Sequence, residues 1–314
     1  MVVGPVVPLT DAQWARIEPL LPDRTPKRGG RWRDHREVID AIAYKFRTGT
    51  QWVHLPEKYG NWRGVYNRLR MWAVDGTWER VFTALVAQAD TDEDVSWAVS
   101  VDSTIVRAHQ HAAGARKKGP RPASRDHAIG RSRGGLTTKI HLAADGRCWP
   151  LAFHLTTGQA GDAPAFTEVL AHLRVPRPRG RPRTRPDLAL ALALALALAL
   201  ALALALALAL ALALALALAD KAYSSRAIRD HLRRRGIRAV IPVPADQRGH
   251  RLRRGSRGGR PPAFDRETYK QRNTVERCIN RLKQWRGIAT RYEKTATIYL
   301  AGLHIAGIFL WSAR

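Results

Sequence analysis

The chain has 314 residues, enough for one large domain or for a medium domain with a small one. It carries 53 lysine and arginine residues against 26 aspartate and glutamate residues, a formal net charge of +27, and so large an excess predicts attraction to a polyanion, most simply nucleic acid. Its two cysteines, Cys148 and Cys278, are far apart and form no C-x-x-C pair, which argues against a disulfide framework or a cysteine-based zinc site and fits a reducing compartment.

The N-terminal part, residues 9–90, is expected to be helical, and no export signal is expected before it. LTDAQWARIEPLLP offers Thr10 or Asp11 as an N-cap, and the apolar face of HREVIDAIAYKFRTG ends near Gly49. NWRGVYNRLRMWAVDGTWERVFTALVAQA continues the pattern, with a polar face that we assign to Arg63, Arg68 and Arg70. Two interpretations stay open: a small DNA-binding module that uses these arginines, or a helical cap packed on the main domain.

After the acidic DTDED the pattern becomes that of strands. In SWAVSVDSTIV the apolar residues Val99 and Val101 alternate with polar residues before Asp102. The segment GLTTKIHLAADGRCWPLAFHLTTG is typical of two strands joined by the turn Asp145-Gly146. A helix (DAPAFTEVLAHL), the repeat, a helix (SRAIRDHLRRRG) and a strand (IRAVIPV) follow, then a long helix from about Arg266 to Trp285 and an apolar segment, 296–311. Three strands in a meander followed by alternating helices and strands argue for an α/β domain with a mixed sheet.

Three arginine-rich segments interleave with proline and glycine, so we expect them to be unpacked loops. They are residues 116–133, 174–186 and 248–260, the last of which contains Arg253 and Arg254. One interpretation is a set of phosphate contacts along a DNA path, for which the planar arginine fork is well suited. The alternative is that they are solvated tethers.

Residues 188–219 repeat Leu-Ala sixteen times without a break. The strict alternation has the period of a strand, yet alanine and leucine are strong helix formers and thirty-two residues far exceed a usual strand. We therefore predict a helix for most of the run. The run reads as an insertion within a folded domain. A membrane span is a third interpretation, but it would separate residues needed on both sides of one domain.

Three carboxylates stand out by position. Asp102 lies on the first strand, Asp220 lies where the fourth strand should end, and Glu276 is the only acid in YKQRNTVERCINRLKQWR. In a mixed sheet of this type the fourth strand lies beside the first, which brings the two aspartates together. On its helix alone, Glu276 is ordinarily a salt-bridge partner of the surrounding basic residues.

Four motifs resemble the DDE transposases of bacterial insertion sequences, and the similarity is greatest to the IS-five group. They are VDSTIVRAHQHAAGARKKG, GGLTTKIHL, LADKAYSS and YKQRNTVERCINRLKQWR. The pattern Y-x-x-R-x-x-x-E-x-x-x-x-x-x-K is matched by Tyr269, Arg272, Glu276 and Lys283. The resemblance covers most of residues 9–314 apart from the repeat. It implies a ribonuclease-H-like catalytic domain, with Asp102, Asp220 and Glu276 as the metal-binding triad. It also implies a short apolar strand leading into Asp220, a part that only the last residues of the repeat, about Leu214 to Ala219, need to play.

The resemblance further implies two Mg²⁺ ions, for which Mn²⁺ would substitute, because divalent ions can activate the nucleophile and steady the leaving 3′ oxygen. Arg272 and Lys283 are expected to hold phosphates of the terminal DNA, and Tyr269 to stack or bond beside them. His109, His111 and His141 are expected to contact DNA or to pack, since carboxylates already supply hard ligands.

The sequence thus predicts a transposase that binds terminal inverted repeats, cleaves the DNA ends and joins the 3′-OH to target DNA. We expect it to act as a homodimer on double-stranded DNA. Its expected location is the bacterial cytoplasm, in association with the nucleoid, and no membrane partner is expected. A catalytically inactive DNA-binding relic, disabled by the repeat, is the alternative. The expected organisation is a helical N-terminal domain (1–92), a ribonuclease-H-like domain (93–314) and the Leu-Ala insertion (188–219) within it.

Overall fold

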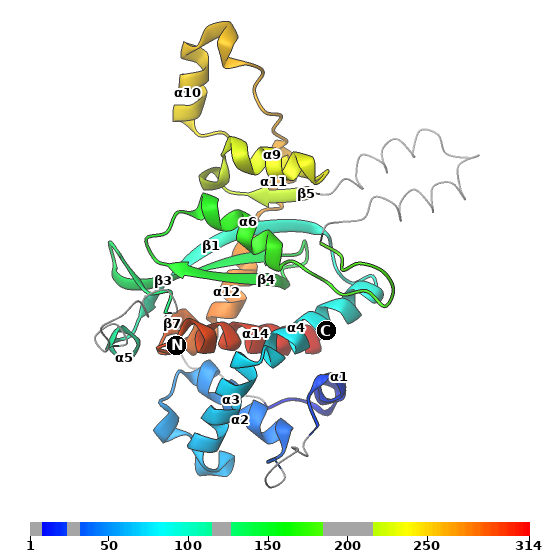
Figure 1. The fold of residues 1–314 in the computed structure, drawn as a ribbon, viewed down its shortest axis with the longest axis vertical. Coiled ribbons are helices and arrows are strands. Elements are labelled where there is room, and N and C mark those ends of the chain that lie inside the picture. The colour runs from blue at the N-terminus through cyan, green and yellow to red at the C-terminus, as the bar shows by residue number, and fades with distance from the viewer. Residues whose placement is uncertain (1–7, 24–31, 115–126, 185–215) are drawn as a thin grey trace, which may run out of the picture.

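The computed structural model describes residues 8–23, 32–114, 127–184 and 216–314. The helix predicted for most of the Leu-Ala run, and most of the arginine-rich stretch 116–133, therefore lie outside the described residues. Figure 1 shows the N-terminal helices at one end, a mixed sheet in the middle, and helices α9 and α10 at the other end.

The N-terminal part is helical, as the periodicity predicts. Thr10 caps the first helix through a capping box with Gln13, and the second helix ends at Gly49, whose φ of 70° suits glycine. The third and fourth helices meet at Asp75 and Gly76. The helices are α1 (Asp11–Ile17), α2 (His35–Thr48), α3 (Trp62–Val74) and α4 (Thr77–Thr91).

Within the described residues the strands form one seven-stranded mixed sheet. β3 pairs antiparallel with both β1 and β4, β5 runs parallel to β1, and β6 runs parallel to β5. This three-strand meander with parallel strands added beside β1 is the predicted α/β arrangement and is ribonuclease-H-like. The strands are β1 (Ala98–Ala108), β2 (Gly130–Ser132), β3 (Gly135–Ala144), β4 (Pro150–Thr157), β5 (Leu216–Ala219), β6 (Arg238–Val240) and β7 (Thr290–Arg291).

Helices lie on both faces of the sheet. One face carries α6 and α9, and the other carries α12 and α14 (Figure 1). The remaining helices are short or peripheral. Their bounds are α5 (Gln110–Ala113), α6 (Asp162–His172), α9 (Arg226–Arg234), α10 (Ala245–Arg253), α11 (Arg266–Lys270), α12 (Asn273–Lys283), α13 (Arg286–Ala289) and α14 (Ala296–Ser312).

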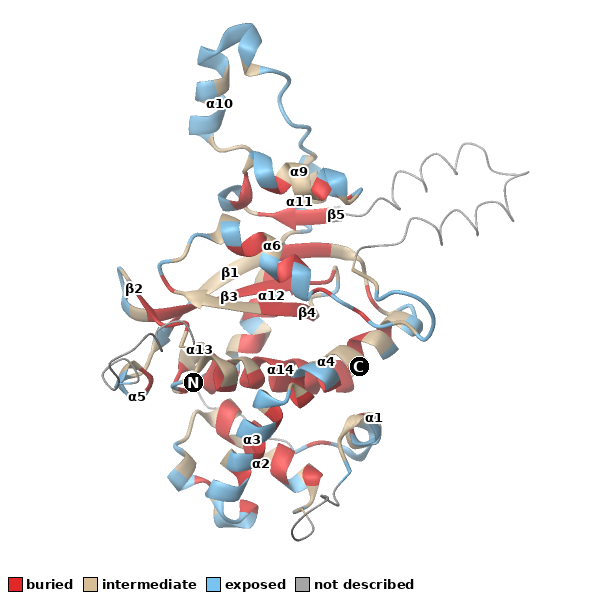
Figure 2. Cartoon of the chain, in the orientation of Figure 1, coloured by how far each residue is buried: buried red, intermediate tan, exposed pale blue. Residues whose placement is uncertain are grey.

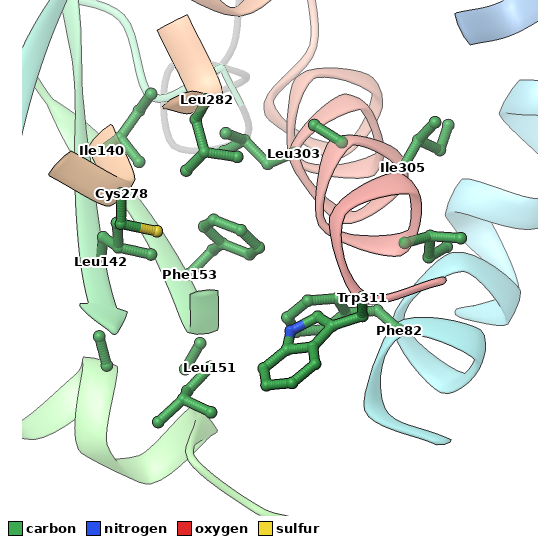
Figure 3. Close-up of a cluster of buried hydrophobic side chains, with 14 of the residues drawn as sticks. Phe82, Ile140, Leu142, Leu151, Phe153, Cys278, Leu282, Leu303, Ile305 and Trp311 are labelled. Carbon is green, nitrogen blue, oxygen red and sulfur yellow. The ribbon is translucent and has the colours of Figure 1, made fainter. Parts of the chain in front are cut away.

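Helix α14 joins the two halves of the core. It is apolar all round and buried nearly throughout, because α3 and α4 cover one side and the sheet covers the other (Figure 2). Phe82 of α4, Phe153 of β4 and Leu303 of α14 meet in this cluster (Figure 3). Gly307 lets Phe82 approach so closely that an added Cβ would lie 2.6 Å from its ring. The N-terminal helices therefore share one core with the sheet.

A buried ion pair also links these two parts. The Lys45 ammonium of α2 contacts the Glu293 carboxylate, which follows β7, and both side chains are almost fully buried. Burial lowers the pKa of Lys45 to about 7, while the adjacent carboxylate favours its charged form.

Two predicted elements differ from the structure. The helix expected from Arg266 to Trp285 is split into α11 and α12, because the residues around Arg272 make hydrogen bonds to the third residue before them and tighten the turn. The arginine-rich segment 248–260, expected to be a loop, is helical up to Arg253, although α10 has no buried residue (Figure 2).

Candidate active site

Strand β1 presents a row of polar side chains to α12. Alternate residues of a strand share a face, and Ser100, Asp102 and Thr104 therefore point the same way. Thr274 Oγ1 donates to Ser100 Oγ at 3.1 Å, the Arg272 guanidinium lies 3.4 Å from Asp102 Oδ2, and Lys283 Nζ donates to Thr104 Oγ1 at 2.6 Å. These contacts fix the helix against the strand beside Asp102.

Strand β5 brings Asp220 to the same place. The parallel pairing of β1 and β5 matches Val101 with Ala219, so the next residue on each strand is an aspartate. The strand prediction for the end of the repeat, near Leu214 to Ala219, is confirmed at Leu216–Ala219. The hydroxyl of Tyr269 points to Asp220, with its oxygen 3.4 Å from Oδ1.

Glu276 lies in the first turn of α12 and is linked to Asp102 through Arg272. The Arg272 guanidinium bonds to Glu276 as well as to Asp102, so one cation bridges carboxylates that belong to a helix and a strand. The structure thus places five residues singled out in the sequence in one region, and Lys283 contacts Thr104, two residues beyond Asp102 on the same face of β1.

The electrostatics of Asp102 reflect this convergence. Burial raises its pKa most, the backbone N–H of Ser103 and the Arg272 guanidinium oppose the rise, and the negative charges of Asp220 and Glu276 add to it. Burial also raises the pKa of Tyr269 and lowers that of Lys283. A site that gathers three like charges is relieved by a bound cation.

The three carboxylates match Mg²⁺ in the kind of ligand they offer but not in their spacing. The donors suit Mg²⁺ in kind, because Asp102, Asp220 and Glu276 offer hard carboxylate oxygens. In spacing they are not gathered: among the described residues no three histidine, cysteine or acidic side chains are close enough to form a metal-holding group. The Arg272 guanidinium lies between two of the three carboxylates, so an ion there requires this side chain to move.

A polar cluster that the sequence did not predict lies on the opposite face of β1. Ser103 Oγ donates to Asp162 Oδ1 at 2.7 Å, and Lys139 Nζ bonds to the same oxygen at 3.0 Å. Burial raises the pKa of nearby Tyr223, and the charges of Asp162, Asp102 and Asp220 contribute. The signal in the sequence is Asp162 itself, the acid that follows GQAG directly after a strand.

The three histidines have different surroundings. His141 is fully buried, its Nε2 lies 2.8 Å from Thr156 Oγ1, and burial lowers its pKa to about 4. His141 therefore packs in the core, and packing is one of the two roles expected for it. His109 stacks edge-on with His111 at 4.7 Å and lies 4.9 Å from the Tyr292 ring.

The predicted DNA-contacting arginines fall into two groups. Arg63, Arg253 and Arg254 are exposed. Arg68, expected on the polar face of its helix, is instead buried, with 8% of its surface exposed. Its guanidinium bonds to His35 Nδ1 at 2.8 Å and stacks over the Trp32 ring at 4.1 Å. The expectation for Arg68 is therefore corrected: this side chain packs between aromatic rings.

Comparisons with known proteins agree on one family. Residues 9–82 match the family described as "Putative transposase of IS4/5 family", and residues 94–191 and 192–311 match the "Transposase DDE domain". The chain is similar to the "Uncharacterized protein y4sN" of Sinorhizobium fredii, with 40% identity over 35% of this chain and 83% of that protein. It is also similar to the "Insertion element IS402 uncharacterized 16.2 kDa protein" of Burkholderia cepacia, with 33% identity over 32% of this chain and 73% of that protein.

A third relative extends further along the chain. The "Putative transposase for insertion sequence element IS6501" of Brucella ovis is 26% identical over 56% of this chain and 98% of that protein. No solved structure matches the chain. In the part of the chain that is described, no helix is long and apolar enough to cross a membrane.

Proposed function

The chain belongs to the DDE transposases, and from that premise we propose that it binds the terminal inverted repeats of an insertion sequence, cleaves the DNA ends and joins the freed 3′-OH to target DNA. The observation that carries the proposal is that β5 sets Asp220 beside Asp102 of β1, while Arg272 links Asp102 to Glu276 of α12. The test is an in vitro cleavage assay with Mg²⁺ or Mn²⁺ on DNA that carries the element's own ends.

Asp102, Asp220 and Glu276 would hold two Mg²⁺ ions, or Mn²⁺ in their place. When bound, such ions supply Lewis-acid stabilisation of the phosphodiester oxygens. The three carboxylates would orient these ions, because the two strands and the helix that carry them are packed in the core. Arg272, which pairs with Asp102 and Glu276, would turn its fork to a DNA phosphate, since phosphate offers the same bidentate acceptor as carboxylate.

Lys283 and Tyr269 complete the proposed DNA contacts next to the carboxylates. Lys283 is held against Thr104 and Tyr269 against Asp220, so each presents a donor beside the place where the strand would be cut. Arg63, Arg253 and Arg254 would contact phosphates further away, because they are exposed and lie at the two ends of the molecule.

The proposed DNA contacts predict a steep salt dependence. The formal net charge of +27 implies that many condensed counterions leave the DNA on binding. If six or more phosphates are neutralised, a plot of log affinity against log salt concentration should have a slope of roughly −5 or steeper. A fluorescence anisotropy titration with a duplex oligonucleotide measures this slope. A nearly flat plot would contradict the polyanion assignment.

The alternative function is a catalytically inactive relic that retains affinity for the terminal repeats. The uninterrupted repeat favours it, whereas the intact triad and the normal pairing of β5 with β1 favour the active enzyme. Because β5 uses only Leu216–Ala219, the preceding Leu-Ala pairs are proposed to be dispensable.

Excising thirteen Leu-Ala pairs should leave the fold intact and raise solubility, since leucine on all sides of a long segment exceeds what one domain can bury. Mg²⁺-dependent cleavage should be preserved or restored. Circular dichroism, light scattering and the cleavage assay measure these effects. Loss of the fold or of DNA binding in the shortened chain would make the repeat a structural element.

The partners are proposed to be double-stranded DNA, as terminal inverted repeats and as target, and a second copy of the chain in a homodimer on that DNA. A bacterial cytoplasmic, nucleoid-associated location follows from this substrate. The division into residues 1–92 and 93–314 is likewise a proposal. Since α4 and α14 share one core, point variants at Arg63 test the role of the N-terminal part better than its deletion.

A further inference from the structure

A cavity of about 360 Å³ lies between α9, the start of α10 and the segment that leads to α11. Four arginines line it, together with a single carboxylate, Asp230. We call it the α9–α10 pocket; its lining residues include Ser224, Arg226, Arg229, Asp230, Arg233, Gln247 and Arg251. Its volume would hold a phosphate group with several waters, since one water occupies about 30 Å³ of liquid.

The charge of the α9–α10 pocket is not balanced by the protein. Asp230 is shared by two of the arginines, with Arg233 at 2.6 Å and Arg226 at 3.6 Å. Among the described residues the guanidinium of Arg251 has neither a hydrogen bond nor an ion pair. One carboxylate therefore faces four guanidinium groups, and the cavity attracts an anion.

Part of the α9–α10 pocket is rigidly built. Arg229 Nη2 donates to Ile241 O at 2.7 Å and to Ser224 Oγ at 3.2 Å, so one nitrogen anchors the guanidinium. Within the described residues its other donors have no partner. Gln247 Nε2 donates to Ser224 O at 2.8 Å, which ties α10 to the same wall. Donors that are held in place before binding lose less freedom when a ligand arrives.

The α9–α10 pocket lies one tight turn from Asp220. The 3-10 turn Lys221–Tyr223 connects them, with Tyr223 N bonded to Asp220 O and Ser224 N to Lys221 O. Four residues at about 2 Å each span roughly 8 Å. Phosphates of one DNA strand advance about 3.4 Å along the helix axis per nucleotide, and they are farther apart than this in space because the strand winds around the axis. The pocket therefore lies within about two nucleotides of Asp220.

We propose that the α9–α10 pocket holds a backbone phosphate of the DNA strand that is cut, within about two nucleotides of the bond placed at Asp102, Asp220 and Glu276. This inference rests on the proposed function. In it, the pocket positions the DNA strand that is cut. Arg251 and Arg226 close over the phosphate, and Arg229 forms the fixed floor.

The first test compares two double variants that each remove two positive charges from the same region. Arg226→Gln with Arg251→Gln empties the α9–α10 pocket of two donors. Arg234→Gln with Arg266→Gln removes two exposed arginines outside it and outside the arginine-rich segments. Binding to a random-sequence 30-base-pair duplex is measured in EDTA over a range of salt concentrations, so that neither metal nor cleavage is involved.

The pocket variant should lose about tenfold or more in affinity, and its log–log salt slope should become less steep by about 1, the value for one lost phosphate contact. The matched variant should change by less than about twofold, which corresponds to RT ln 2, or about 0.4 kcal/mol. Equal losses in the two variants, or no loss in the pocket variant, would overturn the site.

The second test locates the phosphate. Duplexes with the element's own end carry one neutral methylphosphonate linkage at successive positions near the cut. Wild-type affinity should fall most at one linkage within about two nucleotides of the cut, and the pocket variant should not respond there. Equal responses of wild type and variant at that linkage would refute the assignment. If the proposed transposase function fails instead, wild-type cleavage is absent while the metal-free binding difference persists.

Discussion

Asp102→Ala, Asp220→Ala and Glu276→Gln should each abolish DNA cleavage and strand joining, with a loss of about 10³-fold or more, while DNA binding is largely kept. The loss follows if each carboxylate ligates a metal ion, because metal catalysis supplies several kcal/mol and each 1.36 kcal/mol is a factor of ten. The measurement is Mg²⁺-dependent cleavage of a labelled duplex, followed by gel analysis of cut and joined products.

DNA binding gives this prediction its internal control. Each substitution removes a negative charge, so affinity for phosphate should stay constant or rise slightly. Glu267→Gln on α11 is a matched change, since this glutamate is 78% exposed in its side chain and pairs with Lys270. It should leave cleavage unchanged. Near-normal cleavage by any one of the triad variants would remove that residue from the site.

Glu293→Gln is expected to lower the free energy of unfolding by about 3–5 kcal/mol, because it leaves the buried Lys45 ammonium without its counter-charge. Denaturant unfolding of the full chain measures the change. The matched surface substitution is Glu37→Gln in α2, whose ion pair with Arg33 is exposed and should contribute no more than about 1 kcal/mol. Replacing both partners, as Lys45→Met with Glu293→Leu, should recover much of the stability.

The loss in Glu293→Gln should depend on pH in a defined direction. Burial lowers the pKa of Lys45 to about 7 in the folded protein, against an ordinary value near 10.4. Between these values the unfolded chain binds more protons at this site, so the free energy of unfolding rises as the pH rises. The wild type already shows this rise, and without Glu293 the folded-state pKa of Lys45 should be lower still. The deficit of the variant relative to the wild type should therefore grow as the pH falls below about 7, where the wild-type ammonium is charged and paired. A deficit that does not change as the pH is lowered through this value would show that Glu293 does not favour the charged form of Lys45.

Much of the site can be predicted from the sequence, because its parts depend on local patterns. Alternation before Asp102 places this residue on a strand, the return to ordinary sequence at Asp220 marks the end of another, and the order of elements sets those strands side by side. The resemblance of the last motif then points to Glu276. Pairing of Val101 with Ala219 confirms that the two aspartates follow matched residues.

Other features depend on tertiary contacts that periodicity does not report. Arg68 lies where a polar face is expected, yet Trp32, Trp72 and His35 enclose it. The split between α11 and α12 lies within one continuous helical pattern. Asp162 lies behind the site, on the far face of β1, because Ser103 and Lys139 bond to it there.

The short strand β5 also bears on how the chain tolerates changes in length. Its four residues are two copies of a two-residue unit, and two residues is also the side-chain period of a strand. Gaining or losing whole Leu-Ala units before Leu216 therefore leaves leucine and alanine on the same faces beside β1. Asp220 stays in phase with Asp102, whereas a gain of one residue within the strand would invert both faces. The repeat can vary in copy number without altering the spacing on which cleavage is proposed to depend.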